Sequence, residues 1–104
     1  MGRNSTPIQN QGDTELCLFI EPYCEDYWMK PGEAFTVRSE AEGVDVWFDT
    51  YVSKGCLTVW LYQDGDPYKI VGDYAVVDES GARLDSGHQR PSRQRWSAAG
   101  PIID

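Results

Sequence analysis

The sequence predicts an all-β fold, a small antiparallel sandwich or barrel of about six to eight short strands. Apolar and polar residues alternate with a period of two along several short runs, which is typical of half-buried strands. Turn-forming residues recur between these runs, and no helical stripe of apolar residues is longer than a turn. The length of 104 residues fits one domain.

Composition divides the chain into three parts. Residues 1–13 are polar, contain Gly and Pro, and predict a disordered N-terminal lead. Residues 14–87 carry the strand patterns and predict the β domain. Residues 88–104 show no periodicity and predict a C-terminal tail. This tail either docks on the domain or reaches for something else.

The first strands are predicted on either side of a Pro-Gly turn. Residues 16–20 are apolar on both sides, which indicates a buried strand that Pro22 ends. Residues 23–29 fit either a strand or a single turn. Residues 30–33 form a turn, with Pro in its favoured early position and Gly after it. A second strand follows at 34–38.

The clearest pattern is a central hairpin. In 44–49 (VDVWFD) and 57–62 (LTVWLY), aliphatic side chains and a phenylalanine alternate with polar and aromatic ones. The hydrophobic pattern favours a four-residue loop over 52–55, because a slip of one residue would mix the two faces. This register places Trp47 opposite Trp60, a favourable cross-strand pair.

Two further turns continue the sheet. Asp64-Gly65 predicts a tight hairpin turn, which places Tyr68 opposite Leu61 and extends the apolar face. The next strand is predicted at 74–77. Turn-forming residues at 78–81 then allow the chain to pair back on itself.

One face of the central hairpin is the candidate binding surface. Once the aliphatic side chains are buried, the opposite face presents indole, phenol, hydroxyl and carboxylate groups. Tryptophan and tyrosine are enriched at protein interfaces and among the residues that dominate binding energy. The predicted binding residues are Asp45, Trp47, Asp49, Thr58, Trp60 and Tyr62.

An alternative is that a second layer or the tail covers this face. In that alternative Trp96 and residues 102–103 lie over the two indoles, and Arg93 and Arg95 meet the two aspartates. A sandwich with both faces of this sheet partly covered would have the same sequence pattern.

No catalytic residue, metal site or cofactor is predicted. His88 is the sole histidine, and it lies in the polar tail without a nucleophile that the pattern identifies, so we expect it to be exposed. With Cys17, Cys24 and Cys56 it makes a formal zinc donor set, but the cysteine spacing is not that of zinc knuckles. Glu21, Glu25 and Asp26 lie close in sequence, and paired carboxylates perform acid–base catalysis in glycosidases, but no cleft is predicted there.

Charge and cysteine content narrow the partners. Seventeen acidic against 9 basic residues give a formal net charge of −8, which argues against nucleic acids and anionic membranes and favours a basic protein partner. The odd number of cysteines and the absence of a signal-peptide pattern predict reduced thiols and a cytoplasmic location.

The sequence therefore predicts a non-enzymatic, acidic protein-interaction domain, such as an inhibitor, an immunity-type protein or an assembly subunit. Two alternatives use the same aromatic face. One is a carbohydrate-binding module, because sugar rings stack on Trp and Tyr. The other is a homo-oligomeric structural protein, in which the face forms a homodimer interface.

Overall fold

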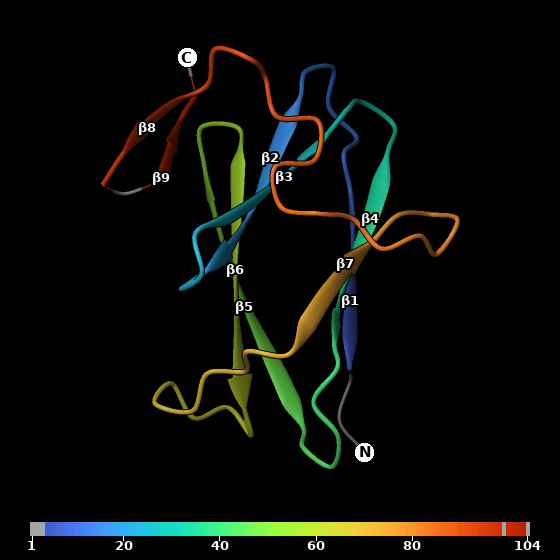
Figure 1. Ribbon diagram of the computed structural model, residues 1–104, viewed down its shortest axis with the longest axis vertical. Coiled ribbons are helices and arrows are strands. Elements are labelled where there is room, and N and C mark those ends of the chain that lie inside the picture. Colours follow the sequence, from blue (N-terminus) through green and yellow to red (C-terminus); the bar gives the residue numbers. More distant parts are fainter. Residues whose placement is uncertain (1–3, 99, 104) are drawn as a thin grey trace.

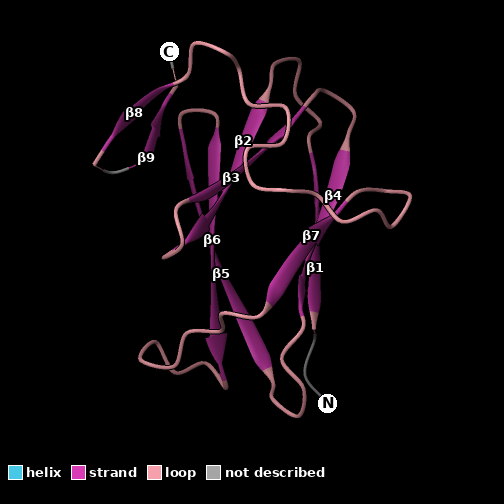
Figure 2. Ribbon diagram, in the orientation of Figure 1, coloured by secondary structure: helices cyan, strands magenta, loops and turns pink. Residues whose placement is uncertain are grey.

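The computed structural model describes residues 4–98 and 100–103, and these residues form nine strands in three sheets. Figure 2 shows strands joined by loops, and no helix occurs within the described residues. The all-β prediction is confirmed. The strands are β1 (Ser5–Gln9), β2 (Leu16–Glu21), β3 (Glu25–Met29), β4 (Ala34–Ser39), β5 (Val46–Ser53), β6 (Cys56–Gln63), β7 (Tyr74–Val77), β8 (Arg95–Ser97) and β9 (Gly100–Ile102).

Two of the sheets pack against each other around the main core. One has the strand order β1-β4-β7, and the other has the order β3-β2-β6-β5 (Figure 1). Alternate side chains of both sheets point inward and are buried. Burial of apolar area at about 25 cal/mol per Å² is the main favourable contribution to folding. The largest fully buried apolar side chains are Phe35, Leu18, Ile20, Met29 and Leu61.

The N-terminal residues contribute a strand. Residues 5–9 form β1, so the prediction of a disordered lead over 1–13 is wrong for this segment. Strand β1 pairs antiparallel with β4, and Ile8 lies buried opposite Phe35. Pro7 is compatible with this position because β1 is an edge strand, where a missing N–H costs no ladder hydrogen bond. Ile8 is the single buried apolar residue in this polar segment, and one such residue does not produce the alternating pattern that predicts a strand.

The four-stranded sheet is mixed. Strands β2 and β6 run parallel, whereas every other pairing between the described strands is antiparallel. Parallel neighbours cannot be joined by a tight turn, and here the connection passes through β4 in the opposite sheet. The sheet therefore consists of two hairpins, β2–β3 and β5–β6, joined along one parallel seam.

The central hairpin forms with a register two residues away from the predicted one. Trp47 lies opposite Tyr62 and Asp49 opposite Trp60, so the predicted pairing of the two tryptophans is wrong. Lys54-Gly55 forms a two-residue turn with φ values of 41° and 74°, as in a type I′ turn, in place of the four-residue loop. Because the shift is an even number of residues, each side chain keeps its predicted face.

The chain after β6 turns more widely than predicted. Tyr68 is 94% exposed and does not extend the apolar face. The predicted turn at Asp64-Gly65 forms, with positive φ at both residues and the Asp66 N–H donating to the Gln63 carbonyl at 2.9 Å. A second turn follows directly, in which the Lys69 N–H donates to the Asp66 carbonyl at 2.9 Å, and it carries Tyr68 away from Leu61. The chain returns to β6 only where Ile70 bridges Tyr62.

The C-terminal segment lies against the four-stranded sheet. The Trp28 N–H donates to the His88 carbonyl at 2.8 Å, so this segment runs along the edge of β3. The β8–β9 hairpin follows and is seen beside β2 and β6 in Figure 1. His88 is half-buried, with its ring 5.6 Å from that of Phe35, so the expected exposed histidine is a packing residue.

Gly55→Ala is expected to lower the free energy of unfolding by about 1 to 2 kcal/mol, because its φ of 74° is costly for a residue with a Cβ. The added Cβ would also lie 3.0 Å from Cγ2 of Ile103. Gly81→Ala is the control, since Gly81 has a φ of 86° and open space around it. Urea denaturation should show the larger loss for Gly55→Ala, and equal losses would mean that the Ile103 contact contributes nothing.

Candidate functional site

The outer face of the four-stranded sheet carries the candidate site. Strand alternation turns Val46, Val59 and Leu61 into the core, where each is at most 4% exposed. The neighbouring positions along β5 and β6 consequently point away from the core. The outer-face side chains of residues 47–51 and 58–62, which we call the open half, are Trp47, Asp49, Tyr51, Thr58, Trp60 and Tyr62.

Aromatic rings dominate the open half. Trp47 is 61% exposed and Tyr51 is 57% exposed. The rings of Trp60 and Tyr62 stack, with centroids 6.1 Å apart and planes inclined by 17°. The indole of Trp47 lies against Gly65, where a Cβ would come within 3.1 Å of the ring. The rings of Trp47, Trp60 and Tyr62 are thus held by their neighbours before any partner binds, which lowers the entropic cost of binding.

The structure brings the predicted residues together. Asp45 precedes β5, is exposed, and accepts a hydrogen bond from the Asp64 N–H through its carbonyl at 2.8 Å. Asp49 is exposed beside the half-buried Trp60. The remaining predicted residues lie in the open half, and their binding role stays a prediction. Tyr51 was missed because the predicted loop began directly after it, although the period of two continues through it from Asp49.

The other part of the outer face is covered by the C-terminal segment. The side chains of Cys17, Phe19 and Trp28 on this part of the sheet form a second buried cluster, against which Ile103 of the C-terminal segment packs. The ring of Trp96 lies 6.3 Å from that of Phe19. The tail therefore covers strands β2 and β3 and the Cys56 end of β6, and it leaves Trp47 exposed. We call this part the covered half.

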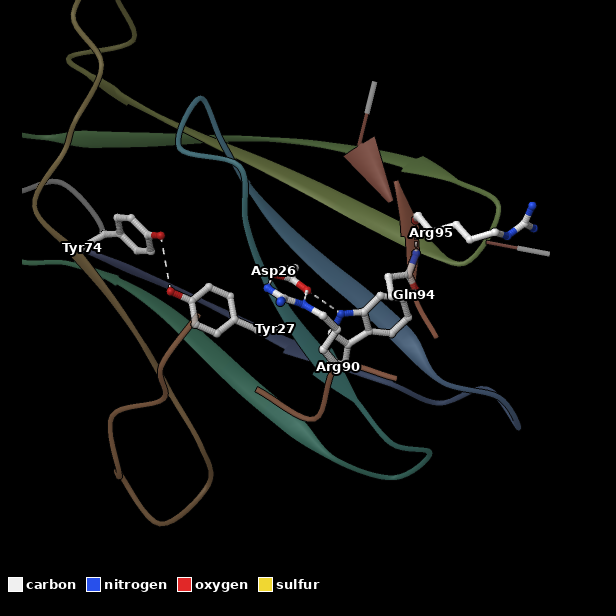
Figure 3. A network of polar contacts seen from close by, with 7 residues as sticks. Asp26, Tyr27, Tyr74, Arg90, Gln94 and Arg95 are labelled. Carbon is white, nitrogen blue, oxygen red and sulfur yellow. Dashed lines mark hydrogen bonds and ion pairs between the residues drawn. The ribbon is translucent and has the colours of Figure 1, made fainter. Parts of the chain in front are cut away.

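An ion pair between a buried carboxylate and a partly exposed arginine anchors the covering segment. Nε and Nη2 of Arg90 donate to the two carboxylate oxygens of Asp26 at 2.8 and 2.6 Å. The indole N–H of Trp28 donates to the same carboxylate at 2.8 Å. Figure 3 shows the Arg90 side chain directed at Asp26, whose side chain is fully buried. In the alternative of a covered face, Arg93 and Arg95 were expected to meet Asp45 and Asp49, whereas the ion pair seen here joins Arg90 to Asp26.

The Asp26 carboxylate is held in its charged form. Burial acts to raise the pKa of Asp26, but the hydrogen bonds from Arg90 and Trp28 and the positive charge of Arg90 outweigh it and lower the pKa. The carboxylate is therefore ionised at neutral pH, and all its strong interactions are internal. Asp26 is a structural residue of the covered half.

The three cysteines and His88 do not converge. Cys17 and Cys56 lie opposite each other across the parallel seam, whereas Cys24 follows the far end of β2 and His88 packs on Phe35. Within residues 4–98 and 100–103 no three His, Cys, Asp or Glu side chains are placed to share a metal ion.

The two thiols at the parallel seam contact each other, and this contact shifts their pKa values in opposite directions. The contact with Cys56 and burial raise the pKa of Cys17, so this thiol stays protonated. The same contact lowers the pKa of Cys56, which is half-buried beneath Ile103. The pair fits a packed seam between two strands better than a nucleophile.

No family model, curated protein or solved structure matches this chain. In the part of the chain that the structure describes, no helix is long and apolar enough to cross a membrane. The open half, with four aromatic rings on one sheet face, is the feature on which a function can be argued.

Proposed function

We propose that this chain is a non-enzymatic, acidic protein-interaction domain that binds a basic protein through the open half. The observation that carries the proposal is a cluster of aromatic side chains on a rigid sheet, with Trp47 61% exposed and Asp45 and Asp49 beside it. Tryptophan and tyrosine provide most of the binding energy at many interfaces. An inhibitor, an immunity-type protein or an assembly subunit would use such a face.

Charge supports a basic partner. The formal net charge of −8 attracts cationic surfaces and disfavours nucleic acids and anionic membranes. Lys54, in the turn at one end of the open half, is a basic residue, whereas the other charged groups of this hairpin are acidic. Complementary charge speeds association, and a partner that desolvates the rings supplies affinity.

The thiols support a reducing compartment. Cys17, Cys24 and Cys56 are all free, although Cys17 and Cys56 lie on directly opposite positions of neighbouring strands. Disulfides persist in oxidising environments and are rare in the cytosol. We therefore propose a cytoplasmic location.

The experiment compares partner binding by matched tryptophan and tyrosine variants. The immobilised wild-type chain captures partners from an extract of its own cells, and each purified partner is titrated by calorimetry. Trp60→Ala and Trp47→Ala are each expected to weaken binding by about 2 kcal/mol, roughly thirtyfold. Tyr68→Ala is the control, because Tyr68 is 94% exposed but lies outside the open half.

Three outcomes would overturn the proposal. Unchanged affinity in both tryptophan variants would remove the open half as the interface. Glycan-array binding that Trp60→Ala abolishes would instead identify a carbohydrate-binding module. A dimer detected by light scattering and lost in Trp47→Ala would identify the open half as a homodimer interface. Weakening of partner binding with rising salt concentration would support the basic partner.

A further inference from the structure

A cavity lies between strand β2 and the C-terminal hairpin, at the border of the open half. Its volume is about 350 Å³, within the range of small-ligand pockets. It lies next to the open half, because Glu21 in its wall is the direct neighbour of Trp60 across the parallel seam. The cavity is lined by Phe19, Glu21, Cys24, Arg90, Trp96, Ser97, Ala98 and Gly100.

Glu21 gives this cavity an acceptor without a partner. Its Oε1 atom is buried and has no hydrogen-bond partner among the described residues. A buried carboxylate oxygen without a donor is costly, and native structures contain few of them. The charge of the carboxylate and a hydrogen bond between it and the Cys24 thiol raise the pKa of Cys24, so this thiol stays protonated, while the Oε1 atom of Glu21 still has no donor. The cavity therefore lacks one hydrogen-bond donor, preferably a positively charged one.

Arg90 lines the same cavity, but its positive charge is compensated by the Asp26 carboxylate. Its guanidinium donates twice to Asp26 and lies over the ring of Trp96, 5.3 Å from the centroid. Arg90 and Asp26 compensate each other, so Glu21 is left as the uncompensated charge. Phe19 and Trp96 provide an aromatic wall beside it, with ring centroids 6.3 Å apart.

We propose that this cavity receives a lysine or arginine side chain of the basic partner, with the cationic group bound by Glu21 and its aliphatic stem against Phe19 and Trp96. The inference rests on the proposed function for the origin of the cation. A charge-assisted hydrogen bond to a carboxylate is about twice as strong as a neutral one, and an aromatic wall adds cation–π attraction. The cavity would thus recognise a basic anchor beside the aromatic contacts of the open half.

The cavity is tested without the partner, on the full chain. Nα-acetyl-arginine methylamide and Nα-acetyl-lysine methylamide are titrated while the ¹H–¹⁵N spectrum is followed. Saturable shifts are expected at the Trp96 indole N–H and the Gly100 amide, with at least one of the two probes. Glu21→Gln should weaken this binding by about tenfold or more. Glu79→Gln, an equal charge change at an exposed turn residue, should leave it unchanged.

The neutral arginine isostere Nα-acetyl-citrulline methylamide tests the need for charge without any variant. Equal binding of citrulline and arginine, or no saturable shift with either cation, would overturn the proposal. Equal binding by Glu21→Gln and Glu79→Gln would do the same. Failure here is separable from failure of the proposed function: partner binding that depends on Trp47 and not on Glu21 keeps the open half and removes the cavity.

Discussion

Arg90→Ala is expected to lower the free energy of unfolding by about 3 kcal/mol at neutral pH, because it leaves the Asp26 carboxylate buried without its cation. The expected loss is at the lower end for a broken buried pair, since Trp28 still donates to the carboxylate and solvent screens the 42% exposed Arg90 side chain. It is nevertheless a large part of the stability of a domain this small. Urea denaturation followed by tryptophan fluorescence measures it.

The pH dependence of this loss has a defined sign. In the wild type the pKa of Asp26 is lowered on folding, so its contribution is present above the unfolded pKa and is lost as the pH falls through the folded value. Without Arg90, burial instead raises that pKa, and acid then relieves the penalty of the buried charge. The difference between wild type and Arg90→Ala should therefore begin to shrink as the pH falls through the raised Asp26 pKa of the variant, above the ordinary aspartate value of about 4, and continue to shrink down to the lowered value of the wild type.

Arg83→Ala is the matched control for Arg90→Ala. Arg83 also donates to both oxygens of a carboxylate, that of Glu40, at 2.9 and 2.5 Å. Its side chain is 56% exposed and that of Glu40 is 32% exposed, so solvent screens the pair. A much smaller loss of stability is expected for this variant than for Arg90→Ala. Equal losses for the two variants would show that burial of Asp26 does not determine the effect.

A chain that ends at Arg93 is expected to remain folded but to lose about 2 kcal/mol of stability, because it uncovers Phe19. The main core contains no residue of the β8–β9 hairpin, so the two packed sheets should persist.

Removal of Ile103 in the same shortened chain should let iodoacetamide modify Cys56 at least about tenfold faster, which corresponds to about 1.4 kcal/mol of lost protection.

Cys24 provides the internal reference for this measurement. It is already exposed in the full chain, although it lines the cavity beside the hairpin, so its rate of modification should change less than that of Cys56. Mass spectrometry of the modified peptides separates the thiols. An unchanged rate at Cys56 would show that the hairpin does not protect the seam, and loss of β-sheet signal in circular dichroism would show that the core needs the hairpin.

The strand alternation in the central hairpin was predictable because one face had to be buried. Val46 and Leu61 are in the core and Trp47 is exposed, as the period of two requires. The exact register was not predictable from this pattern, since a shift of two residues preserves both faces. The deciding signal was Lys54-Gly55, in which both residues adopt positive φ.

The remaining features depend on contacts between distant parts of the chain. Strand β1 is ordered by pairing with β4, and its own residues carry only Ile8 as an apolar signal. The ion pair that docks the tail joins Asp26 to Arg90, which local patterns cannot match. The acidic cluster near Glu21 was noted in the sequence, but the cavity beside it requires the C-terminal hairpin as its second wall.

The parallel seam between β2 and β6 has a consequence for how the protein folds. The hairpins β2–β3 and β5–β6 can each form early, since their strands are joined by short turns. Their association brings Cys17 and Cys56 together, and these residues are separated in sequence by β4, which belongs to the opposite sheet. Closure of such a long loop is entropically costly and characterises slow-folding topologies. The nascent chain therefore exposes the apolar residues of both hairpins until this last pairing, and this interval is when it is most vulnerable to aggregation.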